Sequence, residues 1–342
     1  MRPTGKDVAR RAGVSPKTVS NVLTGTAGVS ARTRTKVEQA MKELSYVPNH
    51  SARSLRNGRS GLIGLALPDL STPYSAELAH HIVDVAHERG YGVQIEETGQ
   101  DPLREFELMS QARTNIIDGL ILNPIFLEKS AVQVGVALPP VVLLGEVSQQ
   151  LADRVWVDGV SAARDMTLLL AARGHRRIAV LGAEHQRYVA TAHTRTEGYR
   201  LALGELNIPH DPSLEIPCDV WSPRGSAEVM RSYLETHELP DAIFCFTDSM
   251  AIGALSVLSA LGYRVPDDVA VAGFDDIADG EFANPPLTTV SFNRREMAER
   301  TIEMLIRRMA DRHREPETTT VGYRIIERAS TLGAQRPARP GQ

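Results

Sequence analysis

The sequence has 342 residues, of which 42% are hydrophobic and 23% charged, and its net charge is −4. This length suggests two or three domains whose cores need no disulfide or metal ion. No apolar run approaches the roughly 18 residues of a membrane span, no apolar segment follows the basic N-terminus, and Cys218 and Cys245 fit no redox or metal motif, so we expect a soluble, cytoplasmic protein.

Positive charge is concentrated at the N-terminus. Residues 1–60 contain 12 Lys and Arg side chains against three carboxylates, a net charge of +9, whereas the remaining 282 residues have a net charge of −13. A short basic segment on an acidic body predicts a polyanion-binding module whose body is kept away from the polyanion. A random fluctuation is the alternative, and the size of the difference over so short a segment argues against it.

The first 48 residues predict three helices. Ser15 is placed as an N-cap with Pro16 at the first helical position, and Gly13 ends the preceding helix. Ala9, Val14 and Val19 are spaced to pack the first two helices together. The predicted helices are Lys6–Ala12, Thr18–Leu23 and Ala31–Leu44.

A helix, a tight turn and a second helix is the spacing of a helix-turn-helix. The outward face of the second helix carries Lys17, Ser20 and Asn21, which can donate to phosphates or base edges. The alternative is a three-helix scaffold with a solvated basic face, and the local pattern alone does not separate the two.

From Gly61 onward, short apolar runs alternate with amphipathic helices. Such alternation predicts an α/β fold of parallel sheets with helices on both faces, and two series of similar size predict two lobes with a crevice between them. The predicted strands are Gly61–Leu67, Gly92–Ile95, Gly119–Leu122, Val141–Leu144, Val155–Val157, Arg177–Leu181, Ala242–Phe246, Val269–Ala272, Thr288–Phe292 and Val321–Ile326. The predicted helices are Ser75–Arg89, Leu103–Thr114, Val160–Ala172, Thr196–Leu206, Arg224–Glu235, Ser249–Leu261 and Arg294 to about Met309.

Several motifs resemble one known family. KDVARRAGVSPKTVSNVLTG and VSARTRTKVEQAMKELSYVPNHSARSL are similar to the DNA-binding head of the LacI/GalR family of bacterial transcription regulators. The body continues the resemblance through GLIGLALPDLSTPY, DGLIL, VWVDG, RGHRRIAVLG, RTEGYRLAL and GFDD. The resemblance implies an all-α helix-turn-helix head at 1–48, a hinge helix or linker at 49–60, and a two-lobed body like periplasmic sugar-binding proteins at 61–342. The N-lobe is expected at about 61–158 plus 292–320, and the C-lobe at about 159–291 plus 321–332.

The resemblance also assigns roles in the head. Ser15, Thr18 and Ser20 would hold phosphates, while Pro16, Lys17 and Asn21 occupy the base-reading positions, where Lys17 suits guanine and Pro16 offers only apolar contact. Leu55 matches the hinge leucine that enters the minor groove, although it could instead be a core residue. Two hinge helices are needed side by side, so we expect a homodimer on a near-palindromic operator of double-stranded DNA.

In the body, the resemblance implies a small-molecule effector in the crevice, usually a sugar or a related metabolite. The matching positions are Asp158, Arg195, Trp221, Thr247 and Asp275, with Arg195 and Asp275 on one lobe, and Asp69, Ser71 and Tyr74 belong to a loop that faces the crevice from the other lobe. Thr247 stands where the family commonly has an amide. Some residues have structural alternatives: Asp248 as an N-cap, Trp221 as core, and Phe292 as the end of a strand. Arg195 is expected to open a helix, where the dipole disfavours a cation, so a functional demand is plausible there.

Other functions fit less well. The sequence has no nucleophile elbow, phosphate loop or zinc-protease motif, and we predict neither an enzyme nor a cofactor. His80, Asp84 and His87 have metal-like spacing, but their helix otherwise reads as an ordinary solvated one. A sugar-binding transport protein is the alternative, but it has no use for residues 1–60. We therefore predict an effector-controlled regulator, favouring a repressor, and a dimer rather than a tetramer, because the tail has no leucine heptad.

Overall fold

The computed structural model describes residues 3–24, 28–46, 60–99, 101–113, 116–125, 138–147, 150–183 and 189–332. The chain forms two compact units, Met1–Ser60 and Gly61–Gln342. The predicted hinge at 49–60, with Leu55, lies outside the described residues apart from Ser60. The first unit contains the helices α1 (Gly5–Ala12), α2 (Pro16–Thr24) and α3 (Ala31–Glu43).

Local signals set the helices of the head. Thr4 and Asp7 form a capping box at the start of α1, and Gly13 ends it with φ of +67°, a conformation that favours glycine. The Ser15 hydroxyl accepts a hydrogen bond from the Thr18 amide at 3.1 Å, which confirms it as the cap of α2. The expected packing of Ala9 and Val19 is also confirmed. Both are buried in the head's core, whose buried members are Val8, Ala9, Val19, Val22, Val37 and Ala40.

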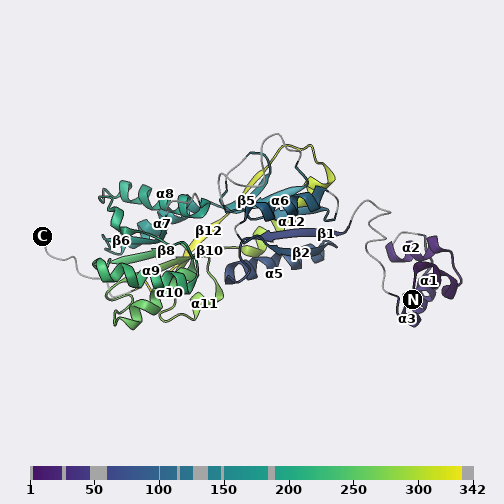
Figure 1. Cartoon of the computed structure of the whole chain (residues 1–342), viewed down its shortest axis with the longest axis horizontal. Helices are drawn as coiled ribbons and strands as arrows, with labels where there is room; N and C mark the ends of the chain where they lie inside the picture. The colour runs from purple at the N-terminus through teal and green to yellow at the C-terminus, as the bar shows by residue number, and fades with distance from the viewer. Residues whose placement is uncertain are drawn as a thin grey trace. The chain divides into compact units, whose positions relative to one another are not determined.

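The described residues of the body form two six-stranded sheets, each with helices on both faces (Figure 1). We call the first sheet with its helices the first lobe. All its strands pair in parallel, in the order β11-β5-β4-β3-β1-β2. These strands are β1 (Leu62–Leu67), β2 (Gly92–Glu97), β3 (Gly119–Leu122), β4 (Val141–Leu144), β5 (Asp153–Val157) and β11 (Thr318–Val321). Their helices are α5 (Pro73–Glu88), α6 (Pro102–Arg113) and α12 (Arg294–Ala310).

The second lobe is built in the same way, with the strand order β12-β10-β9-β8-β6-β7. Its edge strand β12 is antiparallel to β10, whereas its other strand pairs are parallel. The strands are β6 (Ile178–Ala183), β7 (Glu215–Pro217), β8 (Ala242–Cys245), β9 (Ala270–Phe274), β10 (Thr288–Phe292) and β12 (Tyr323–Ile326). The helices are α7 (Gly159–Ala172), α8 (Ala190–Glu205), α9 (Pro223–Thr236), α10 (Asp248–Ala260) and the short α11 (Ala278–Glu281), and η1 (Pro212–Leu214) is a 3₁₀ turn.

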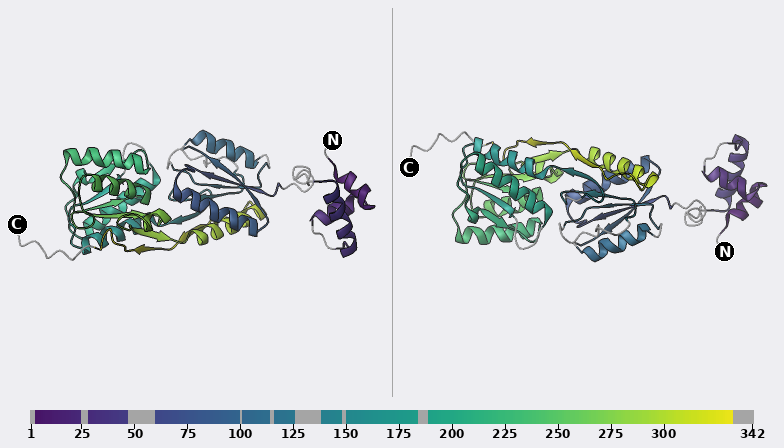
Figure 2. Two further views of the ribbon diagram at one scale, coloured as in Figure 1. Left: turned by 90° about the horizontal axis from the view of Figure 1, so that it is seen from below. Right: turned by 90° about the horizontal axis from the view of Figure 1, so that it is seen from above.

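In the part of the body that the structure describes, the chain passes between the lobes three times. It crosses between β5 and α7, returns between β10 and α12, and crosses again at Gly322 between β11 and β12. Figure 2 shows the yellow-green segment of α12 running along the first lobe, where it packs on α5, β4 and β5, which are far from it in sequence. Each lobe is therefore assembled from separate stretches of the chain.

Several elements differ from the sequence-based expectation, and the short α11 and η1 were not predicted at all. The single strand predicted at Val321–Ile326 is two strands in different sheets, divided at Gly322. β7 was not expected, because three residues give too little alternation to detect. Helix α8 begins at Ala190 rather than at Thr196, and Val189 provides no side-chain cap. The Ala190 amide donates instead to the Ile125 carbonyl of the first lobe at 3.0 Å, a contact that sequence cannot reveal. Within the described residues, no helix is both long and apolar enough to cross a membrane.

Candidate functional site

A cavity of about 470 Å³ lies between the two lobes of the body. It is lined by segments that follow β1, β3 and β4 of the first lobe and β6, β7, β8 and β9 of the second. These are the carboxyl ends of the strands, where open α/β sheets bind their ligands. The volume is in the range of small-molecule sites.

Six of the eight predicted effector residues line this cavity: Asp69, Tyr74, Arg195, Trp221, Thr247 and Asp275. Asp158 lies outside the lining, and its carboxylate caps α7 by accepting from the Ser161 amide at 3.0 Å and the Ser161 hydroxyl at 2.6 Å. Ser71 lies outside the lining too. Its amide and hydroxyl both donate to Asp69, at 2.8 and 2.7 Å, in a turn. The structure thus gives both residues a local structural role.

Arg195 is the principal cation of the cavity, and its side chain is only 8% exposed. Its guanidinium lies 3.4 Å from the Glu146 carboxylate of the first lobe, donates to the Phe246 carbonyl, and stacks 3.4 Å above the centre of the Phe274 ring. The expectation that Arg195 opens its helix is wrong, because α8 begins five residues earlier. These partners fix the orientation of the guanidinium group. A planar guanidinium held in this way can donate two hydrogen bonds to a pair of oxygen acceptors.

Asp275 faces the cavity from a strained loop. Its φ is +115° and that of Asp276 is +54°, in the left-handed region that disfavours a side chain. The Asp275 amide donates to the Val290 carbonyl at 3.0 Å, and its carbonyl accepts from Arg294. Burial raises the pKa of the Asp275 carboxyl to about 7, although the guanidinium groups of Arg195 and Arg294 act to lower it.

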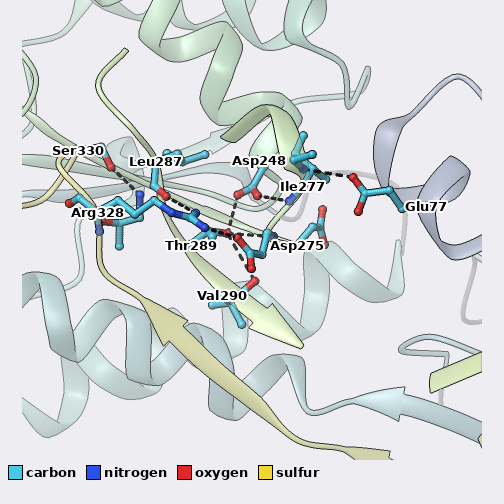
Figure 3. A network of polar contacts seen from close by, with 12 residues as sticks. Glu77, Asp248, Asp275, Ile277, Leu287, Thr289, Val290, Arg328 and Ser330 are labelled. Carbon is cyan, nitrogen blue, oxygen red and sulfur yellow. Dashed lines mark hydrogen bonds and ion pairs between the residues drawn. The ribbon is translucent and has the colours of Figure 1, made fainter. Parts of the chain in front are cut away.

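A hydrogen-bonded network within the second lobe holds this loop in place (Figure 3). The buried Asp248 carboxylate accepts from the Ile277 amide at 2.9 Å and from the Thr289 hydroxyl at 2.6 Å. Arg328 donates to the Asp276 carboxylate at 2.8 Å and to the Leu287 carbonyl at 2.9 Å. Strained residues persist where surrounding contacts determine them fully, and this network supplies those contacts.

The predicted cap of α10 is corrected by the structure. The cap is Thr247, whose hydroxyl accepts from the Met250 amide at 3.2 Å, and Asp248 is the first residue of the helix. Burial, together with the Asp275 carboxylate, raises the pKa of Asp248 well above its usual value. The Thr247 side chain both caps the helix and lines the cavity.

Aromatic rings form the apolar part of the lining. The rings of Tyr74 and Phe292 meet edge to face at 6.2 Å, and Phe274 lies 6.3 Å from Phe292. Phe292 is the last residue of β10 and also lines the cavity, so it has both a structural role and a place in the site. Trp221 packs against the core and also lines the cavity.

The sequence reasoning missed several lining residues, above all Glu146 and Asn123. Both follow predicted strands directly, Asn123 after β3 and Glu146 two residues after β4. The rule that ligands bind at the carboxyl ends of strands would have indicated them. Glu146 is 7% exposed, and its Oε2 atom is buried without a hydrogen-bond partner among the described residues.

In the head, the described residues predicted to contact DNA lie on or beside α2. Ser15, Pro16 and Lys17 are exposed, and Thr18, Ser20 and Asn21 are half-buried. The hydroxyl groups of Ser15 and Thr18 lie 2.9 Å apart, at the start of the helix. The arrangement presents a cation, hydroxyl groups and an amide on one short helix, as phosphate and base-edge recognition requires.

No group of three or more potential metal ligands gathers in the part of the chain that the structure describes. Of the three residues with metal-like spacing, His80, Asp84 and His87, the exposed His80 Nε2 lies 3.5 Å from the exposed Asp84 carboxylate.

Both units of the chain match known protein families. Residues 4–49 match the model for bacterial regulatory proteins of the lacI family, and residues 168–331 match a periplasmic binding protein-like domain. The transcriptional repressor PurR of Histophilus somni is 31% identical over 330 residues, which cover 96% of this chain and 98% of the relative. The repressor CytR of Escherichia coli is 32% identical and covers 96% of both chains.

Solved structures agree with the sequence relatives. A lac repressor dimer bound to operator and the anti-inducer ONPF superimposes with a TM-score of 0.82 at 28% identity, covering 97% of this chain and all of that one. The regulator CelR in complex with cellobiose gives a TM-score of 0.69 at 31% identity, covering 96% of this chain and all of that one. The chain therefore belongs to the lacI family of bacterial regulatory proteins and is a DNA-binding transcription regulator.

Proposed function

We propose that the protein represses transcription from a near-palindromic operator, as a dimer, under the control of a sugar bound between its lobes. The observation that carries the effector assignment is the pair of buried, oppositely charged groups at the cavity, Arg195 and Asp275, beside aromatic rings. A sugar offers paired hydroxyl groups to planar charged side chains and an apolar ring face to aromatic ones. The related CelR binds cellobiose, which makes β-glucosides a sensible first probe.

The cavity suits a ligand that donates as well as accepts hydrogen bonds. Carboxylate oxygens of Asp69, Glu146 and Asp275 can accept from hydroxyl groups, and Arg195, Asn123 and Thr247 can donate. A buried polar group without a partner costs about 1–3 kcal/mol, so the open Oε2 of Glu146 favours a ligand that donates to it.

In the head, we assign Lys17 to direct reading of a base, with Pro16 and Asn21 beside it. Ser15, Thr18 and Ser20 are assigned to phosphates, and Leu55 to the minor groove. Exposed polar side chains on the first turns of a helix are suited to the major groove, while an apolar wedge unstacks a base step and bends the duplex.

Calorimetry tests the effector and its coupling to DNA. A thermal-shift panel of mono- and disaccharides, cellobiose included, first identifies the ligand, because a ligand at 100 times its Kd stabilises by about 2.7 kcal/mol. Titrations with and without operator should then give affinities that differ by about 5–150-fold, by linkage. Equal affinities in the two titrations would rule out an allosteric role for the cavity.

Variants separate the effector site from the DNA-binding head. Arg195→Ala should lose the effector response and keep operator affinity within a few-fold. The matched control is Arg164→Ala, which removes an exposed arginine of the same lobe that pairs with Glu205 at 2.6 Å. That control should keep the response. Light scattering tests assembly, and a tetrameric mass at micromolar concentration would contradict the dimer.

A further inference from the structure

Two side chains of the first lobe reach the loop of the second lobe that carries Asp275. Glu77, on α5, accepts a hydrogen bond at Oε1 from the Ala278 amide at 3.2 Å (Figure 3). Arg294, the first residue of α12, donates to the Asp275 carbonyl. The two contacts therefore hold the loop at positions three residues apart, from the opposite lobe.

The two side chains also pair with each other. Glu77 Oε2 lies 3.4 Å from Arg294 Nε, and the Arg294 side chain is 10% exposed. Its guanidinium carbon lies 5.9 Å from the centre of the Tyr74 ring and 5.5 Å from that of Phe292, both of which line the cavity. The pair is thus adjacent to the proposed effector site although neither member lines the cavity.

We propose that Glu77 and Arg294 form an interlobe clamp on the loop of Asp275, and that this clamp sets the balance between open and closed lobes. The clamp stabilises closure because its contacts to Ala278 and Asp275 exist only while the lobes are together. It also positions Asp275, because the carbonyl that Arg294 holds belongs to the residue whose carboxylate faces the cavity.

The contacts between Glu77 and Arg294 are longer than those of a fully formed ion pair. Two ion pairs within a single lobe are short and hydrogen-bonded: the buried pair of Arg308 with Asp153 and the half-buried pair of Arg328 with Asp276 are both at 2.8 Å. The Glu77–Arg294 pair is longer, and Arg294 Nε has no hydrogen-bond partner among the described residues. The cross-lobe pair of Arg195 and Glu146, also at 3.4 Å, likewise leaves Glu146 Oε2 without a partner. If the lobes closed further, Arg294 Nε and Glu146 Oε2 would come within hydrogen-bonding distance of partners. The closed state with a ligand bound would then be stabilised by these hydrogen bonds as well as by the ligand's own contacts.

Distance measurements between spin labels test the clamp in the protein without any ligand. Cysteines replace the exposed Leu103 on α6 of the first lobe and the exposed Glu235 on α9 of the second. Burial raises the pKa of both native thiols, Cys218 and Cys245, so the introduced cysteines are labelled selectively. Dilution with unlabelled protein isolates the distance within one chain.

Glu77→Ala should shift the distribution toward longer interlobe distances, raising the ratio of open to closed molecules roughly fivefold, the effect of one partly exposed charged hydrogen bond. Glu77→Gln keeps an acceptor for the Ala278 amide and should lie between parent and Glu77→Ala. The matched control is Glu88→Ala, which breaks a 2.7 Å pair with Arg295 between the same two helices, inside the first lobe. Its distances should equal those of the parent.

Unchanged distances in both Glu77 variants would overturn the proposal, as would an equal shift in Glu88→Ala. Circular dichroism verifies folding, and if Glu77→Ala does not fold, the intermediate shift of Glu77→Gln decides. The clamp itself does not depend on the proposed function, but its effect on ligand binding rests on the proposed effector cavity. If the sugar panel finds no ligand while the distances shift as expected, the clamp stands and the effector assignment fails.

Discussion

The head presents its six described DNA-binding candidates within seven consecutive positions, 15–21, and their side chains are exposed or half-buried. The cavity of the body is lined by residues from Pro68 to Met297, and three of its charged groups, Arg195, Glu146 and Asp275, are nearly inaccessible to water. One surface is thus local and solvated, while the other is long-range and buried.

This difference has an energetic meaning. An exposed side chain such as Lys17 contributes little to folding, so it can be exchanged to change DNA binding alone. A buried charge on a strained loop lowers the stability of the folded protein even without a ligand, because its desolvation and the backbone strain are present in both states. A substitution there therefore changes ligand binding and folding stability together. Substitutions should therefore separate binding from stability in the head and combine them in the body.

The largest effect is expected at Asp275, as a pH dependence of stability. Its native pKa of about 7 exceeds the unfolded value of about 3.9, so the native state retains a proton that the unfolded state has lost between these values. The stability that it contributes is present at low pH and falls as pH rises toward 7. Asp275→Asn should remove this fall and gain roughly 3 kcal/mol over the parent between pH 5 and pH 8.

Urea denaturation followed by circular dichroism at several pH values measures this change. Asp275→Glu retains a titrating carboxyl and should retain the fall. Parallel stability curves for the parent and Asp275→Asn would contradict the prediction.

The next effect is expected at Asp248. Asp248→Ala leaves the buried Ile277 amide without its acceptor and should cost about 2 kcal/mol of stability and the effector affinity together. Asp118 is the matched residue of the first lobe, because its carboxylate accepts from the Gly61 amide at 2.8 Å. Asp118→Ala should lose similar stability yet keep effector affinity, as judged by calorimetry. If both variants lost binding equally, the network would have no special role in holding Asp275.

Lys17→Ala tests the opposite behaviour in the head. It should reduce discrimination at one base pair of each operator half-site by about 1–3 kcal/mol and leave the melting temperature unchanged. Lys42→Ala removes the same charge from the exposed surface of α3 and should lower affinity for all operator variants alike. Fluorescence anisotropy with an operator series measures both. A uniform loss for Lys17→Ala would make it a phosphate contact.

The smallest effect is expected at Ser30, the N-cap of α3, whose hydroxyl accepts from the Thr33 amide at 3.2 Å. Ser30→Ala should cost the head about 1 kcal/mol, as caps generally do, and leave the body unaffected. Differential scanning calorimetry should show a shift in the transition of the head alone. A shift of both transitions would mean that the two units do not unfold independently.

The same contrast decides what could be predicted from the sequence. The helices of the head follow from signals within four residues, such as Ser15 with Thr18 and the glycine after Ala12. The body's strands were predicted as apolar runs, but Gly322 gave no sign that one run serves two sheets. The start of α8 depends on a carbonyl of the other lobe, and it could not be found in the local sequence.

The sequence likewise predicted some residues of the cavity and missed others. Arg195 and Asp275 were found through a family resemblance, whereas Glu146 needed only the strand-end rule. Asp158 was predicted as an effector contact, but an aspartate before a helix also serves as a cap, and the structure shows that second role through its hydrogen bonds to Ser161. The clamp residues Glu77 and Arg294 carried no signal, because their partners are more than 15 residues away in sequence.

The interleaved lobes have a consequence for synthesis on the ribosome. Five strands of the first sheet are complete at Val157, but α12, which packs on β3, β4 and β5, ends at Ala310. At about 5–20 residues per second, the nascent sheet waits about 8–30 s for that helix. The buried apolar residues Ile302 and Leu305 of α12 indicate that the waiting face is hydrophobic. The head needs no such wait, because its core is complete at Tyr46, so we expect it to fold before the body.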